Sequence, residues 1–196
     1  MFISSILLIV LTVALPLVIF LKKNEKNKGM LILYCIFFML LWWLQYAPLH
    51  EFSHYLAERI RGTKIIDYQL LPIFWEGEFK RPYIELGGDG KASIIGTLAP
   101  YIKSLLFVIA GYFIIKKSSI KRIFLMGAVL IIFVLTSMFD VIDNYMGFVL
   151  YNFGDFKLIS NLTNPILSYV VGLLFCLAIS TVALLSLKIL YSKSYK

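Results

Sequence analysis

Five long apolar segments dominate this chain and restrict the folds that are open to it. About 20 apolar residues cross the hydrocarbon layer of a bilayer as a helix, and each segment reaches or approaches that length. Because 60% of the residues are hydrophobic and only 15% are charged, a soluble domain of 196 residues could not cover so much apolar surface. We therefore expect an all-α polytopic membrane protein with a single membrane-embedded domain. The expected transmembrane helices are about residues 3–21, 30–61, 93–115, 123–143 and 165–190.

The segment between the second and third helices, residues 63–92, is an insertion of different character. Its run Ile65–Leu70 and its turn at Gly87-Gly88 suit a small β-hairpin. The first helix has no basic residue before it and no small-residue cleavage site after it, so we expect it to be retained as a span rather than removed as a signal peptide.

Basic residues gather at alternate ends of the expected helices. They lie between the first two helices, between the third and fourth, and after the fifth: Lys22, Lys23, Lys26, Lys28; Lys116, Lys117, Lys121, Arg122; Lys188, Lys193 and Lys196. The positive-inside rule then predicts a cytoplasmic C-terminus and an insertion on the opposite side, in what the composition indicates is a prokaryotic cell membrane. The net charge of +8 is explained by this topology and by contact with anionic lipid. A nucleic-acid partner is not expected, because no water-exposed face combines basic and aromatic residues.

The two histidines of the chain are four residues apart, and Glu51 directly follows the first of them. Positions i and i+4 share one face of a helix, so His50 and His54 can both reach one metal ion. Glu51 can then take a proton from a water beside that ion. This is the H-E-x-x-H arrangement of zinc hydrolases. The alternative, an accidental pair of interfacial histidines, does not explain the glutamate.

A catalytic zinc normally has three protein ligands and a water. The chain has no third histidine, and Cys35 and Cys176 lie inside apolar segments, so a carboxylate has to complete the set. Asp140, Asp143 and Asp155 fall on the same expected side of the membrane as the histidines. Each has a plainer interpretation, with Asp140 and Asp143 ending the fourth helix in water and Asp155 capping a following helix.

The stretch from His50 to Lys64 resembles the first conserved block of the site-2 protease-like intramembrane zinc metallopeptidases, with Ser53 where the family usually has glycine. Residues 67–91 look like the β-rich insertion of that family, and Gly96–Pro100 is similar to the motif that opens its next helix. The Asn-Pro and Leu-Asp-Gly ligand motif of the family is missing. Instead, Asn152–Ser160 resembles the Ser-Asp motif of the M50B-like branch, in which the acid precedes a short helix and a final span.

The resemblance implies one Zn²⁺ per chain, held by His50, His54 and Asp155. Asp140 is the second choice for the third ligand, because Phe139-Asp140 can mimic the Leu-Asp pair, and Asp143 is the third choice. The implied activity is that of an endopeptidase acting on membrane-spanning or membrane-adjacent proteins. In it, Glu51 is the general base that takes the proton of a zinc-activated water and passes it to the leaving amine.

Other interpretations stay open at this point. A catalytically silent relative would bind or chaperone transmembrane helices, although the intact Glu51 argues against it. A transporter would spread its polar residues over several helices, and a hydrolase of lipids or small molecules would use the same motif. A regulatory membrane partner or a homo-oligomer is also compatible with the sequence. Lys103, inside the third apolar segment, is expected to extend toward the membrane interface.

Overall fold

The computed structural model of the chain describes residues 2–71, 82–87, 93–118 and 122–193. Five helical segments are long and apolar enough to cross a membrane: Ile6–Asn24, Lys28–Ile60, Ile94–Lys117, Ile123–Tyr151 and Pro165–Ser192. A two-stranded antiparallel sheet lies between the second and the third. The expected fold class is therefore confirmed, and the helices are compatible with a multi-pass membrane protein. The fourth segment continues to Tyr151, well past its expected end near residue 143.

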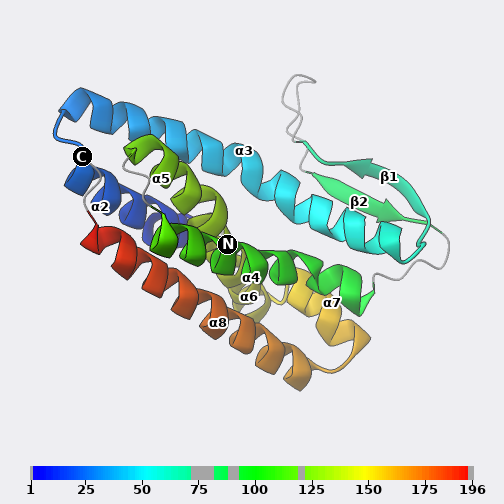
Figure 1. Cartoon of the computed structure of the whole chain (residues 1–196). Helices are drawn as coiled ribbons and strands as arrows, with labels where there is room; N and C mark the ends of the chain where they lie inside the picture. Colours follow the sequence, from blue (N-terminus) through cyan, green and yellow to red (C-terminus); the bar gives the residue numbers. More distant parts are fainter. Residues whose placement is uncertain (1, 72–81, 88–92, 119–121, 194–196) are drawn as a thin grey trace.

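The elements follow one another along the chain as a bundle of long helices with a sheet at one end (Figure 1). The first span comprises α1 (Phe2–Ile9), the π-helical turn η1 (Val10–Ala14) and α2 (Leu15–Asn24); α3 (Lys28–Ile60), β1 (Ile65–Gln69), β2 (Tyr83–Leu86) and α4 (Ile94–Lys117) come next. The fourth span comprises α5 (Ile123–Val129), η2 (Leu130–Leu135) and α6 (Thr136–Tyr151), and the short α7 (Asp155–Leu162) leads to α8 (Pro165–Ser192).

Short polar side chains begin three of the long helices. Asn27 accepts a hydrogen bond from the backbone N–H of Met30 before α3, Ser93 accepts one from Gly96 before α4, and Asn164 accepts one from Leu167 before α8. Each side chain satisfies a backbone N–H that has no partner within the helix. The apolar runs determine where helices lie, and these caps determine where they begin.

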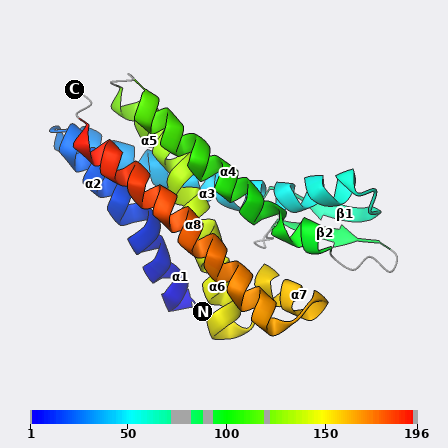
Figure 2. The same ribbon diagram turned by 60° about the horizontal axis from the view of Figure 1, so that its bottom comes forward.

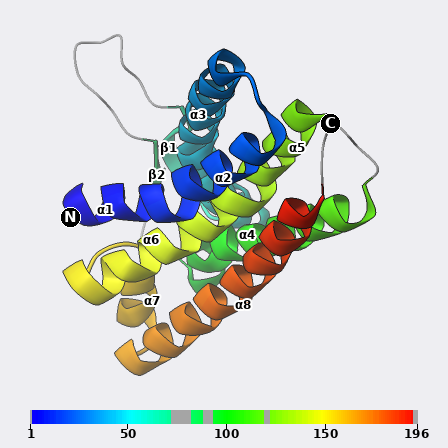
Figure 3. The ribbon, with the colours of Figure 1, turned by 90° about the vertical axis from the view of Figure 1, so that its left-hand side faces the viewer.

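The fourth span lies at the centre of the bundle, between the first span and α8 (Figure 3). In its most apolar stretch of 18 residues, 67% is buried inside the bundle. The corresponding share in each of the other four spans is 33% or less. All the residues from Val134 to Val141 are buried. The segment η2, which overlaps the start of this stretch, is π-helical, so each of its turns contains more residues than a turn of an α-helix. At its end, the hydroxyl of Thr136 donates to the carbonyl of Ile131, five residues earlier, at 2.7 Å. Such a turn changes which residues of α6 face inward, and Asp140 is among them.

The basic ends of the helices lie together at the end of the bundle away from the sheet (Figure 1). Lys193 donates from its Nζ to the carbonyls of Lys116 and Ser118, at 3.3 and 3.2 Å, and Lys23 donates to the carbonyl of Tyr191. The lysine-rich ends of the helices thus lie at one end of the bundle. This agrees with the sequence, in which basic residues occur at every second connection between the spans. Which side of the membrane this end occupies stays a prediction.

The sheet lies beside the last turns of α3, at the opposite end of the bundle (Figures 1 and 2). Its strands β1 and β2 pair antiparallel, with Tyr68 opposite Ile84 and Gln69 opposite Tyr83, and a bulge at Ile66. The ring of Tyr68 packs on that of Tyr55 in α3, with centroids 4.8 Å apart. The pairing confirms a small hairpin-like insertion, but the expected turn at Gly87 is wrong: Gly87 follows β2 and donates from its backbone N–H to the carbonyl of Lys64, just before β1, at 2.8 Å. Residues 72–81, between the two strands, and Gly88 lie outside the described residues.

Glu58 ties the end of α3 to the start of α4. Its side chain is buried and accepts hydrogen bonds from the backbone N–H and hydroxyl of Ser93, at 3.0 and 2.6 Å, and from the hydroxyl of Thr63 at 2.7 Å. Gly96 packs directly against this carboxylate. A Cβ at Gly96 would lie 1.8 Å from Oε1 of Glu58 and 2.8 Å from Oγ of Ser93.

The substitution Gly96→Ala is therefore expected to lower the free energy of unfolding by about 1–3 kcal/mol, because the added methyl group overlaps atoms that are themselves held in place. Thermal unfolding of the detergent-solubilised protein measures the effect. Gly147→Ala is the matched control, since a Cβ there would come no closer than 3.6 Å to the carbonyl of Phe153. Equal melting temperatures for the two variants would show that Glu58 moves aside freely.

Candidate metal centre

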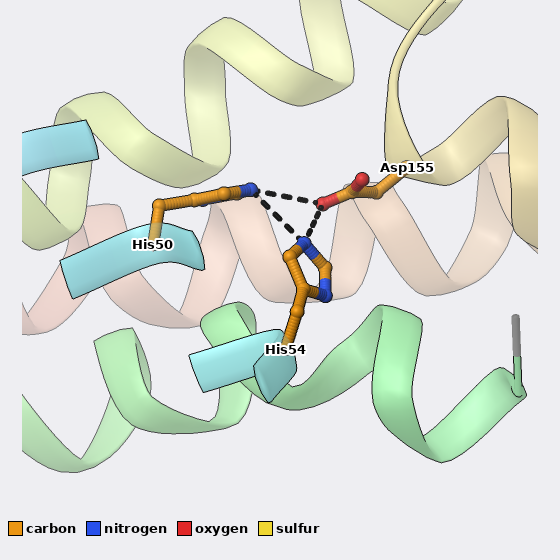
Figure 4. A group of neighbouring side chains, drawn as sticks. All are labelled: His50, His54 and Asp155. Atoms are coloured by element: carbon orange, nitrogen blue, oxygen red, sulfur yellow. Dashed lines mark hydrogen bonds and ion pairs between the residues drawn. The ribbon is translucent and has the colours of Figure 1, made fainter. Parts of the chain in front are cut away.

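Two histidines of α3 and one aspartate of α7 point toward one another (Figure 4). The Nε2 atoms of His50 and His54 are 3.2 Å apart, and Oδ2 of Asp155 lies 3.2 Å from the first and 3.3 Å from the second. The three side chains are mostly buried, with exposed fractions of 10%, 17% and 13%. Each offers one ligand atom, and these residues form a group that could hold a metal ion.

The backbone between α6 and α7 brings Asp155 to the histidines. Asn152 ends α6 in the left-handed region with a φ of 54°, and Gly154 follows with a φ of 91°. These two residues reverse the chain within a few positions, which a β-branched residue could not do without strain. Asp155 is the first residue of α7 and Gly154 occupies the cap position, so the interpretation of Asp155 as an N-cap is wrong.

The carboxylate of Asp155 is held on both sides. Tyr101 of α4 donates from its hydroxyl to Oδ2 at 2.7 Å. Asp155 is thus the acceptor in its contact with α4.

The second nitrogen of each imidazole contacts an acceptor outside the group. Nδ1 of His54 lies 2.8 Å from the carbonyl of Gly96, and Nδ1 of His50 lies 2.6 Å from Oδ1 of Asp140. Because a carbonyl or a carboxylate can only accept, we assign the proton of each neutral ring to Nδ1. The Nε2 atoms then carry lone pairs that face each other and the Asp155 carboxylate. Three facing lone pairs repel unless a cation lies among them.

Asp140, the second-choice ligand, lies behind His50 rather than beside the Nε2 atoms. It is fully buried, and its Oδ2 accepts from the hydroxyl of Ser104 at 2.9 Å and from Nζ of Lys103 at 3.2 Å. The interpretation of Asp140 as a helix end in water is therefore wrong, because α6 continues to Tyr151 and encloses it. Lys103 does not extend to the interface either, since it contacts Asp140 inside the bundle.

Asp143, the third choice, lies outside the group of facing ligand atoms and lines a cavity of about 640 Å³ next to it. Aromatic and amide side chains line the same cavity, which reaches His50 and Glu51. Its lining includes Trp43, Tyr46, Asn144, Asn152, Phe153 and Lys157.

Glu51 lies where this cavity meets a second one. The smaller cavity, of about 190 Å³, is lined by Ile84 and Leu86 of β2 and by residues at the start of α4. Glu51, Asp155 and Leu158 line both cavities. Glu51 thus comes from the same helical turn as the histidines and lines both cavities next to them.

The sequence points to His50, Glu51, His54 and the three aspartates. It does not point to Tyr101 and Ser104 of α4, and it predicts a different position for Lys103, at the membrane interface. Tyr101, Lys103 and Ser104 occupy one turn of α4 and contact the carboxylates of α6 and α7. A lysine within an apolar span was the available signal, because a buried charge at such a position needs a partner.

Comparison of the chain with protein-family models, with curated proteins and with solved structures finds no match. The residues and geometry of the site therefore carry the functional argument.

Proposed function

We propose that this chain is a membrane-embedded zinc endopeptidase of the site-2 protease-like type, which hydrolyses peptide bonds in membrane-spanning or membrane-adjacent proteins. One observation carries the proposal. The ligand atoms of His50, His54 and Asp155 converge beside Glu51, at one end of a bundle of apolar helices.

The spacing of the three ligand atoms fits zinc. A tetrahedral Zn²⁺ with bonds of about 2.0–2.1 Å separates its ligand atoms by about 3.3 Å. The three separations in this site are 3.2, 3.2 and 3.3 Å. Two imidazoles and a carboxylate also form a known type of catalytic zinc site, in which the fourth position is left for water or substrate. His50 donates its other N–H to a carboxylate, as metal-binding histidines commonly do.

Each residue then has a defined role. A zinc ion held by the three ligands would act as a Lewis acid that polarises the scissile carbonyl and lowers the pKa of a water. Glu51, one position beyond His50, accepts the proton of that water and delivers it to the leaving amine. Tyr101 holds Asp155 by its hydrogen bond, and the carbonyl of Gly96 fixes the tautomer of His54.

The two cavities and the sheet suggest how a substrate approaches. An extended peptide would run past Glu51 from the larger cavity into the smaller one, which β2 borders. An exposed strand edge can add such a peptide by backbone hydrogen bonds, and a transmembrane helix has to unwind before its backbone can be attacked. From the positive-inside rule we propose that the basic end and the C-terminus lie in the cytoplasm, and from the composition that the membrane is that of a prokaryotic cell.

Cleavage in a defined membrane system tests the proposal. Purified protein is reconstituted into liposomes with a panel of single-span membrane proteins, and products are identified by mass spectrometry. We expect cleavage that stops when a zinc chelator removes the metal and returns when Zn²⁺ is restored, at one Zn²⁺ per chain. Cleavage that persists in the metal-free protein would overturn the proposal. Binding of the panel without cleavage, in protein loaded with zinc, would favour the catalytically silent alternative.

A further inference from the structure

Lys103 is a mostly buried cation that the proposed reaction does not use. It lies nine residues beyond Ile94, the first residue of α4, which is about 13 Å along the helix axis. Its side chain is only 16% exposed. A lysine at such a depth in an apolar bundle is costly unless it is paired, and intramembrane ionisable residues mark functional sites by default. Its ion-pair partner is Asp140, at 3.2 Å.

The carboxylate of Asp140 connects Lys103 to the metal centre. Oδ2 faces α4 and receives Lys103 and Ser104, whereas Oδ1 faces α3 and contacts Nδ1 of His50 at 2.6 Å. The two oxygens of one carboxylate are rigidly linked, so holding Oδ2 on one side also fixes Oδ1 on the other. Lys103, Asp140 and His50 thus form a chain of contacts from α4 through α6 to α3.

We propose that Lys103 is a positioning residue for the metal centre and acts through Asp140. Its charge keeps the buried carboxylate in the orientation in which Oδ1 accepts from Nδ1 of His50. The Nε2 atom of His50 then faces His54 and Asp155 with its lone pair. Ser104 supplies a neutral hydrogen bond, so Lys103 provides the counter-charge that a buried carboxylate needs. The inference rests on the proposed function only in requiring that the centre binds a metal.

Titration with Co²⁺ tests this role in the full-length protein in detergent, because the visible absorption of Co²⁺ reports both occupancy and coordination geometry. Removing an outer partner of a metal-binding histidine typically weakens metal affinity by about 10- to 100-fold. We expect Lys103→Met to weaken Co²⁺ binding by that factor and to change the spectrum of the bound ion. Lys188→Met, the same substitution at an exposed lysine of α8, is the control and is expected to bind Co²⁺ as the wild type does.

A double-mutant cycle separates positioning from a general effect on folding. If Lys103 acts through Asp140, then Lys103→Met has no further effect on Co²⁺ affinity in a protein that already carries Asp140→Asn. Wild-type affinity in Lys103→Met, or an equal loss with and without Asp140→Asn, would overturn the inference. If Lys103→Met alone does not fold, the Co²⁺ affinity of Asp140→Asn is compared with that of the double variant, which lacks both charges. Equal affinities support the inference, and a weaker affinity in the double variant overturns it. A wild-type protein that binds neither Co²⁺ nor Zn²⁺ would instead contradict the proposed function.

Discussion

Replacement of Glu51 by glutamine is expected to slow peptide-bond hydrolysis by about 10²- to 10⁴-fold, the range over which a positioned general base contributes to a rate. The amide has nearly the same shape as the carboxylate but cannot accept the proton of the water. Because Glu51 lies outside the group of ligand atoms, the zinc content should stay at the wild-type level. The measurement is kcat/KM on a cleaved membrane substrate, together with metal analysis of the same preparation.

Glu25→Gln is the matched control for this experiment. Glu25 lies just after α2, at the basic end of the bundle, where it accepts a hydrogen bond from the backbone N–H of Asn27 that an amide oxygen can also accept. This variant should retain wild-type activity. Full activity in Glu51→Gln would remove Glu51 from the reaction, whereas loss of zinc in that variant would mean that Glu51 helps to bind the metal.

The second large effect concerns the third ligand. Asp155→Ala and His54→Ala are each expected to abolish stoichiometric zinc binding, because a site with two protein ligands does not retain the ion through purification. Asp140→Ala should behave differently, since Asp140 contacts the far nitrogen of His50 at 2.6 Å. We expect it to weaken zinc binding by about 10- to 100-fold but to bind one Zn²⁺ at saturation.

Mass spectrometry of the metal content, after equilibration in buffers of defined free zinc, distinguishes these two behaviours. Asp143→Ala provides the comparison for the remaining candidate and should bind zinc as the wild type does, because Asp143 lines the neighbouring cavity. Loss of zinc in Asp140→Ala with full binding in Asp155→Ala would reverse the roles of the two aspartates.

The fold class could be predicted because the signals that determine it are local. Runs of apolar residues define spans, and the alternation of lysines between their ends follows from the sequence alone. His50, Glu51 and His54 could be grouped for the same reason, since one helical turn brings them together. The end of the fourth span was misplaced because Asp140 and Asp143 suggested an exit into water, whereas buried contacts with Lys103 and Ser104 allow the helix to continue.

The choice among the aspartates could not be made from the sequence with the same strength. Asp140 and Asp143 are three residues apart and share one side of α6, yet about 60° of rotation separates them around the helix. That rotation turns one toward His50 and leaves the other beside a cavity. The position of Asp155 depends on the backbone angles of Asn152 and Gly154, which the motif did not specify.

The ionisable groups gathered around the histidines also have an electrical consequence. Asp140, Asp155 and Glu51 contribute three negative charges when they are ionised, and Lys103 contributes one positive charge, so that with neutral imidazoles the sum is −2. In a surrounding of low polarity, an uncompensated sum of this size is strongly unfavourable. A divalent cation brings the total to zero, whereas a monovalent ion leaves a negative excess and a trivalent ion a positive one. If the centre binds a metal as proposed, the charge of the ion that it favours depends in large part on side chains that do not touch it.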